Sequence, residues 1–228
     1  MATTRFYLGG VNAAINLGGP LSGGGLWEGS ITSANTTKKA LTTTGSTANN
    51  ANATAVGTGV NPNDIMFWQG ISEPLAAQTI SGNVSGVTAC RENTSINTNA
   101  FAQMGVFVIN GSGVKVATLY AGKTTAGVQE FNNPSANNRI FPNGTAAVAI
   151  SSYTCSAGDR ICIEIGARLE TTRTGDTVTV YTGDNNASDL PLGNGTDNSL
   201  TKNGWVEFDS ALTFATLTAK RATATFMG

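Results

Sequence analysis

The sequence predicts an all-β protein whose fold is a jelly-roll-like two-sheet antiparallel β-sandwich. Short segments in which apolar and polar residues alternate recur from Arg5 to Phe214, and clusters of Gly, Asn, Pro and Ser separate them. Alternation with a period of two is typical of strands, and no competing helical period of useful length appears. The length of 228 residues fits one sandwich, since such domains run to about 200–250 residues.

We therefore expect a single domain over residues 1–228. It should carry a long Thr/Asn/Ala-rich loop at about 33–63 and a C-terminal extension at 210–228. A second expected loop, rich in Gly, Asn and Asp, spans residues 183–203. Structureless connections longer than about 12–15 residues are uncommon, so each loop is expected to be partly strand or to form functional surface.

The clearest strand is predicted at residues 160–169, where alternation is strict. Its polar face, with Arg160, Glu164 and Arg168, is expected to meet water. Residues 146–150 precede a turn-forming stretch and are expected to pair with this strand as a hairpin or sandwich corner. The residues predicted to face the core are Ile161, Ile163, Ile165, Ala167 and Leu169.

Residues 100–109 are apolar on both faces, which predicts a central strand, with residues 114–120 returning antiparallel after a Gly-rich turn. Further strands are predicted at 5–8, 26–32, 64–72, 79–91, 128–131, 176–181, 205–208 and 212–216.

Charge and hydropathy exclude several classes of partner. Thirteen Lys and Arg stand against 14 Asp and Glu, and no basic cluster offers the phosphate neutralisation that nucleic acid requires. No stretch approaches the roughly 18 apolar residues of a membrane span, and the start lacks the apolar region of a secretion signal. No glycine-rich phosphate-binding motif occurs, so we expect no cofactor, no nucleic acid and no membrane partner.

The sequence contains no histidine, which removes Ser-His-Asp and Cys-His catalysis and His-ligated zinc. A glycosidase working with two carboxylates is the remaining enzymatic alternative. Because strands normally carry some acidic residues, we expect no enzyme and no catalytic residues. The candidate carboxylates are Glu73, Glu92, Glu130, Glu164 and Glu207.

Two further patterns favour ordinary structural roles. Residues 184–189 offer oxygen ligands but lack the central Gly and final Glu of a calcium loop, so we expect a turn and no metal. Cys90, Cys155 and Cys162 are odd in number and fit free thiols in a reducing cytoplasm. A disulfide between Cys155 and Cys162 is the alternative.

Three tryptophans raise a carbohydrate-binding alternative. Trp27, Trp68 and Trp205 are expected to be core or interface residues, but together they could also form a platform on which sugar rings stack. With the loop at 183–203, this would make a carbohydrate- or receptor-binding module that takes a host surface glycan.

Several stretches carry a resemblance to a known family. They are ATTRFYL at 2–8, ISEPLAAQTISG at 71–82, RIFPNG at 139–144, AGDRICIEIG at 157–166, DLP at 189–191 and WVEF at 205–208. In these stretches the chain resembles β-sandwich virion structural proteins of tailed bacteriophages. The resemblance spans residues 2 to about 209 and implies a capsid decoration or a tail or fibre component. It implies no catalytic or binding residues, and residues 9–25 and 210–228 depart from the family pattern.

We therefore expect a non-enzymatic virion structural protein, made in the host cytoplasm and located in the virion. Its expected partners are other virion proteins and further copies of itself in a closed oligomer such as a trimer. Large apolar residues near a chain end suggest a buried landing site. The predicted interface residues are Phe214, Leu217, Phe226 and Met227, and the alternative is a last strand that packs in its own sheet.

Overall fold

The computed structural model describes residues 2–13, 38–45, 49–56, 62–92, 99–122, 130–131, 135–141, 147–171, 174–184, 188–195, 197 and 202–216. These residues form strands and turns, and none of them lies in a helix. The predicted all-β class is therefore confirmed. In this part of the chain there is accordingly no long apolar helix of the kind that crosses a membrane.

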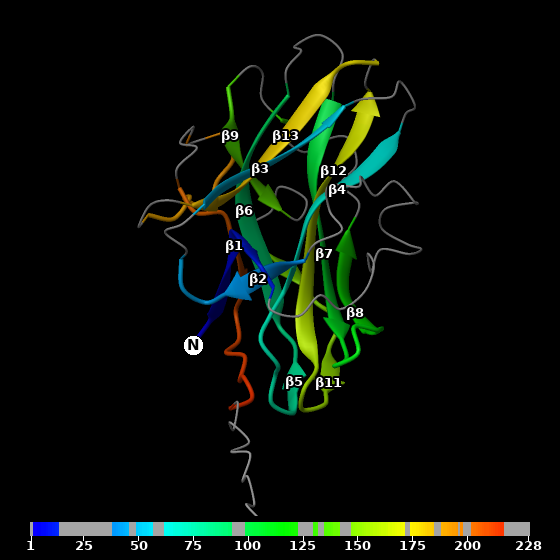
Figure 1. Ribbon diagram of the computed structural model, residues 1–228, viewed down its shortest axis with the longest axis vertical. Helices are drawn as coiled ribbons and strands as arrows, with labels where there is room; N and C mark the ends of the chain where they lie inside the picture. Colours follow the sequence, from blue (N-terminus) through cyan, green and yellow to red (C-terminus); the bar gives the residue numbers. More distant parts are fainter. Residues whose placement is uncertain are drawn as a thin grey trace, which may run out of the picture.

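The described strands form two sheets. The large sheet has 12 strands, and the small one pairs β5 (Gln78–Ile80) with β11 (Tyr153–Cys155) at one end of the molecule (Figure 1). The strands of the large sheet are β1 (Thr4–Asn12), β2 (Lys39–Thr42), β3 (Asn49–Val56), β4 (Asn63–Ile71), β6 (Asn83–Glu92), β7 (Asn99–Ile109), β8 (Lys115–Gly122), β9 (Asn137–Phe141), β10 (Val148–Ala149), β12 (Arg160–Thr171), β13 (Thr177–Asp184) and β14 (Trp205–Phe208).

The large sheet curls into a nearly closed barrel. Its strand order is β3-β13-β6-β14-β1-β2-β4-β12-β7-β8, and β9 and β10 also pair with β6. Residues that follow β10 bring the β8 end back toward β6. The amide of Ile150 donates to the carbonyl of Gly82, and the amide of Ser151 donates to the carbonyl of Leu119.

The structure differs from the predicted two-sheet antiparallel sandwich because of strand β2. This strand pairs antiparallel with β1 and parallel with β4, the latter through only two residue pairs, Lys39 with Gly70 and Ala40 with Ile71. It thereby joins two sets of strands that would otherwise form separate sheets. The segment expected as a loop at 33–63 contains this joining strand as well as β3.

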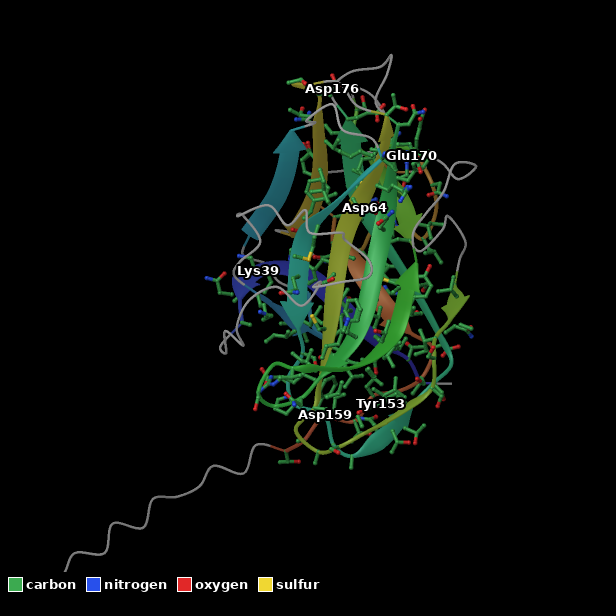
Figure 2. All side chains as sticks on the ribbon, turned by 90° about the vertical axis from the view of Figure 1, so that its right-hand side faces the viewer. Lys39, Asp64, Tyr153, Asp159, Glu170 and Asp176 are labelled. Carbon is green, nitrogen blue, oxygen red and sulfur yellow. The ribbon has the colours of Figure 1, made fainter. Side chains whose placement is uncertain are left out.

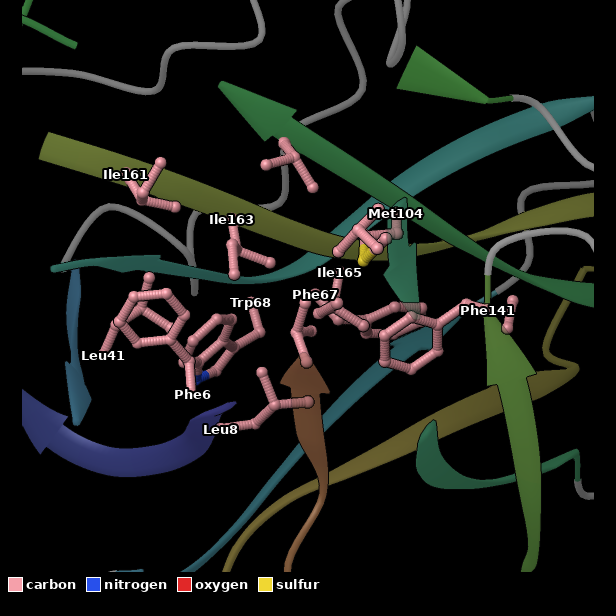
Figure 3. Close-up of a cluster of buried hydrophobic side chains, with 14 of the residues drawn as sticks. Phe6, Leu8, Leu41, Phe67, Trp68, Met104, Phe141, Ile161, Ile163 and Ile165 are labelled. Atoms are coloured by element: carbon pink, nitrogen blue, oxygen red, sulfur yellow. The ribbon is translucent and has the colours of Figure 1, made fainter. Parts of the chain in front are cut away.

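One apolar core fills the barrel (Figure 3). Side chains from β1, β2, β4, β6, β7, β8, β9, β12, β13 and β14 all enter it. Phe6 stands edge-on to Phe208, with ring centroids 6.0 Å apart. Burying each large apolar side chain contributes roughly 1.5–3 kcal/mol, so this continuous core is the main source of stability.

The two best-defined strands lie where alternation predicts. All five residues expected on the inner face of β12 are in the core, and β7 lies centrally between β12 and β8. The predicted hairpin before β12 is wrong: β10 pairs with β6, and β11 pairs with β5. Both edges of β12 are occupied by β4 and β7, so no edge is left for residues 146–150.

The remaining strand predictions divide into three groups. Residues 5–8, 64–72, 176–181 and 205–208 are largely strand, and 79–91 splits into β5 and β6 because Gly82, at φ 103°, makes a turn. Glu130 and Phe131 lie outside strands, and residues 212–216 make one isolated bridge, between Phe214 and Leu75. Residues 26–32 lie outside the described part of the chain.

Candidate functional site

A pocket of about 410 Å³ opens beside β2. Its volume is within the roughly 300–1,000 Å³ of small-ligand sites. Leu41 is buried at the pocket, whereas Thr43, Thr44 and Glu73 are exposed around it. The lining residues are Ala40, Leu41, Thr42, Thr43, Thr44, Glu73, Phe214 and Ala215.

The pocket exists because β4 turns away from β2 after two residue pairs. Beyond Ile71 the chain follows β12: the Ser72 amide donates to the Ile161 carbonyl, and the Ile161 amide donates to Ser72 Oγ. Arg160 Nη1 also donates to the Ser72 carbonyl at 2.7 Å. As a result, no described strand pairs with Leu41 or Thr42 on the edge that faces away from β1.

Phe214 and Ala215 also line the pocket, in the stretch that follows β14 toward the end of the barrel that holds β5 and β11 (Figure 1). The Ala76 amide donates to the Thr213 carbonyl, and the Ala215 amide donates to the Pro74 carbonyl. Phe214 is half-buried, with its ring edge-on to Phe6 at 6.1 Å. Of the four predicted interface residues, Phe214 thus packs on its own domain and lines the pocket. The other three, Leu217, Phe226 and Met227, lie outside the described residues.

The 183–203 segment is tied to the barrel by a charged cluster around Arg5. The Arg5 guanidinium stacks over the Trp205 ring at 3.9 Å and donates to Asp189 at 2.7 Å and to Glu207 at 3.0 Å. Asp189 also accepts hydrogen bonds from Tyr7 and Asn203. Both oxygens of this carboxylate are therefore engaged by protein donors. Asp184 ends β13, Asp189 forms an isolated bridge with Asn203, and residues 185–187 lie outside the described residues, so the turn at 184–189 stays a prediction.

The tryptophan platform does not form from Trp68 and Trp205. Both side chains are buried, and their indole N–H groups donate to the carbonyls of Gly9 and Leu190. Buried rings cannot stack on a sugar, so a glycan site would need other residues. The third member, Trp27, lies outside the described residues.

Glu164 does not face water, contrary to the prediction. Its side chain is fully buried on the outer face of β12, and Gln69 Nε2 donates to its Oε1 at 2.6 Å. Burial raises the pKa of Glu164 to about 7, although Gln69, Lys115 and Lys38 oppose the shift. Glu164 Oε2 and Gln69 Oε1 have no hydrogen-bond partner, so an ionised Glu164 would carry charge on a buried oxygen that no donor contacts.

Further polar side chains lie along the same outer face of the barrel. Gln103 Nε2 donates to Asp64 at 3.2 Å, and Arg168 bridges Asp64 and Glu170. Asp64 and Glu170 lie toward the end of the barrel that holds Asp176, opposite the turn at Asp159 (Figure 2). The alternation of apolar and polar residues predicted that this face meets water. The prediction was wrong because amides and an arginine on neighbouring strands can partner polar groups that are buried there.

The other candidate carboxylates are dispersed. Glu92 is buried near Glu130, and burial, together with the Glu130 charge, raises the pKa of Glu92 to about 8. Glu207 belongs to the Arg5 cluster, and Glu73 lines the pocket. Glu73 is exposed where it lines the pocket. Thr43 and Thr44, which also line the pocket, were missed because they lie in the segment expected to be loop, which in fact contains β2 and β3.

The three cysteines are free and buried. Cys155 packs in the barrel core, whereas Cys162 belongs to a separate cluster with Ile71, Phe107 and Ile109 on the outer face. The alternative disulfide between Cys155 and Cys162 is therefore not formed. Burial raises the pKa of Cys162, which keeps this thiol protonated.

No protein-family model matches the chain, and no curated protein is similar to it in sequence. Among the solved structures that align with the chain, two show a distant likeness. A structure of infectious bursal disease virus, Gt strain, aligns at 12% identity and TM-score 0.34, covering 71% of this chain and 34% of the other. A CocE/NonD family hydrolase from Staphylococcus aureus aligns at 10% identity and TM-score 0.30, covering 90% and 34%. The chain thus spans about a third of each, and at these TM-scores neither likeness bears on function.

Proposed function

We propose that this protein is a non-enzymatic structural protein of a tailed-phage particle, a capsid decoration or a tail or fibre component, that acts through subunit–subunit contacts. The observation that carries the proposal is the unpaired edge of β2 at Leu41 and Thr42, which opens into a pocket beside Phe214. An unpaired strand edge is a template for pairing with another chain, and native proteins usually cover or blunt such edges.

Charge and sequence add to this support. The net charge is −1 and only 12% of residues are charged, and a net charge near zero favours association over mutual repulsion. The resemblance to tailed-phage virion proteins over residues 2 to about 209 supports a place in a tailed-phage particle. Other virion proteins and further copies of this chain, arranged as a closed oligomer such as a trimer, are the proposed partners, and the virion is the proposed location.

The test is to find the protein on particles. Virions purified from a lysate of the source culture are probed with an antibody against the chain and by mass spectrometry, after density-gradient separation from soluble protein. We expect the protein to co-sediment with particles in a fixed ratio to the major capsid protein. Its recovery only in the soluble fraction would contradict the proposal.

A second candidate function is glycan binding, and the lining of the same pocket favours it. Thr43, Thr44 and Glu73 are exposed where they line the pocket, and Phe214 lines it too, a mixture of polar groups and an aromatic residue that suits a sugar. A glycan array with wild-type protein and with Glu73→Ala tests this function. Binding that the substitution abolishes would favour a receptor-binding module, and a blank array would leave assembly as the function.

A further inference from the structure

We propose that the pocket beside β2 receives residues 217–228 of a second copy, which add a short strand to the open edge at Leu41 and Thr42. This inference rests on the proposed function, since it specifies the subunit contact. Beta-strand addition derives its affinity from main-chain hydrogen bonds and its specificity from pockets for alternate side chains.

The pocket has the shape that such a strand needs. Ala40 to Thr44 line it on one side, and Phe214 and Ala215 line it on the other. Within β2, Leu41 and Thr42 offer a strand edge with no described partner strand. The stretch around Phe214 is held by hydrogen bonds from the Ala76 amide to Thr213 and from the Ala215 amide to Pro74. Leu41 packs in the barrel core and also lines the pocket, which gives an incoming apolar side chain an apolar residue to contact.

The sequence of residues 217–228 matches this pocket. Residues 222–226, Ala-Thr-Ala-Thr-Phe, alternate small or apolar residues with threonine, as a strand does. Lys220 and Arg221 precede them. Glu73 is the charged residue among those that line the pocket, so the charges are complementary.

A second copy is the favoured source of the strand. Ala215 already lines the pocket, so the same chain would have to reverse direction soon after it in order to enter. Residues 211–227 contain no Gly, Pro, Asn, Asp or Ser, the residues on which tight turns depend. Residues 217–228 are twelve residues, which can reach roughly 40 Å at about 3.3 Å each and so can span to a neighbouring copy.

The test is a complementation experiment with two variants of the full chain. The first lacks residues 217–228 and keeps the pocket, and the second, Thr43→Trp, keeps the segment and fills the pocket at an exposed position. Light scattering after size exclusion should show an oligomer for the wild type and monomers for each variant. An equimolar mixture should form a one-to-one heterodimer, because each variant supplies what the other lacks.

Charge reversal sharpens the test. Glu73→Lys should weaken self-association by about tenfold or more, as should Lys220→Glu combined with Arg221→Glu, and mixing or combining the reversals should restore it. Thermal melting monitors folding of every variant. If the shortened chain does not fold, binding of a synthetic 217–228 peptide to wild-type protein, lost in Thr43→Trp, replaces it as the readout.

Several results would overturn the inference. They are a monomeric wild type, a shortened chain that still assembles, a mixture that stays monomeric, or a pocket that binds a glycan while Thr43→Trp leaves assembly intact. Failure here is distinguishable from failure of the proposed function. A shortened chain that still enters particles would reject only this contact, whereas absence of the wild-type protein from particles would reject the structural role itself.

Discussion

Strand β12 buries both of its faces, but the two faces hold different kinds of side chain. The inner face packs Ile161, Ile163 and Ile165 into the barrel core, where no polar group needs a partner. The outer face buries Glu164 beside Gln69, with one oxygen of each lacking a partner. Burial alone therefore does not decide how a face contributes to stability. The inner face stabilises the folded protein at any pH, whereas the outer face does so only while Glu164 is protonated.

The largest effect should come from making the inner face resemble the outer one. Ile163→Asp places an ion where the core offers no hydrogen-bond donor among its apolar side chains, at a cost of several kcal/mol. Since a domain of this size is stable by only about 5–15 kcal/mol, we expect no folded protein. Soluble yield and a cooperative thermal melt measure the outcome. Ile163→Val is the matched control and should cost roughly 0.5–1.5 kcal/mol, and a melt of the aspartate variant near wild type would mean that the strand's faces are inverted.

The second prediction removes the charge from the outer face. Glu164 titrates at about 4.5 in an unfolded chain and at about 7 in the folded one, so the folded state binds its proton more tightly. Its stabilising contribution is complete below about pH 4.5 and is lost as pH rises through about 7. At about 1.4 kcal/mol per pKa unit the loss is about 3 kcal/mol.

Glu164→Gln, which mimics the protonated acid, should therefore be more stable than wild type by up to about 3 kcal/mol at pH 8 and nearly equal to it at pH 4.5. Urea unfolding at both pH values measures the difference. Glu73→Gln, at an exposed position, is the control and should show no such pH-dependent gain. Equal stability of wild type and Glu164→Gln at pH 8 would contradict the protonated-acid interpretation.

A smaller effect is expected on the outer face of the other half of the barrel, where Arg5 is paired with Asp189 and Glu207. Arg5→Ala removes two partly exposed ion pairs and the stacking on Trp205. Exposed pairs contribute at most about 1 kcal/mol and a cation–π contact about 0.5–1, so a total loss of roughly 1–2 kcal/mol is expected. The urea midpoint should fall with an unchanged slope. Arg5→Lys should retain part of the stability, and a loss as large as that at a core position would show that the cluster is more than a surface clamp.

The smallest expected effect is that of a chelator. The described residues hold no group of Cys, Asp or Glu side chains arranged for a metal, and Asp189 is engaged by Arg5, Tyr7 and Asn203. Addition of EDTA should leave the melting temperature unchanged within error. A fall of several degrees would mean that residues 184–189 hold calcium, since a bound ligand stabilises the folded state.

Sequence reasoning succeeded where one face of a strand is uniformly apolar. It placed the inner residues of β12 and the central position of β7, because a period of two fixes which side chains share a face. It failed where the outcome depends on pairing. The alternation does not determine which strand edges pair. The four residues of β2, Lys39–Thr42, join the expected two sheets into one large sheet.

The candidate site was predicted only in part. Phe214 was singled out and does line the pocket, but it packs on Phe6 of its own chain. Leu41 and Thr43 were not assigned to a site, and Glu73 was a candidate only for a carboxylate pair, since the pocket arises from the divergence of two paired strands and no local motif marks such a divergence. The buried pair of Glu164 and Gln69 was missed for a similar reason, because the two residues meet only through the β4–β12 register.

The pairing of β1 with β14 governs how this chain reaches its native state. Residues 4–7 lie against residues 205–208, so the barrel cannot close while the ribosome is still adding the last strand. Topologies dominated by such distant pairings fold in milliseconds to seconds, slowly for domains of ordinary stability. Until β14 has been synthesised, one edge of β1 stays unpaired. A nascent chain in that state depends on chaperones or on dilution to avoid aggregation with other chains.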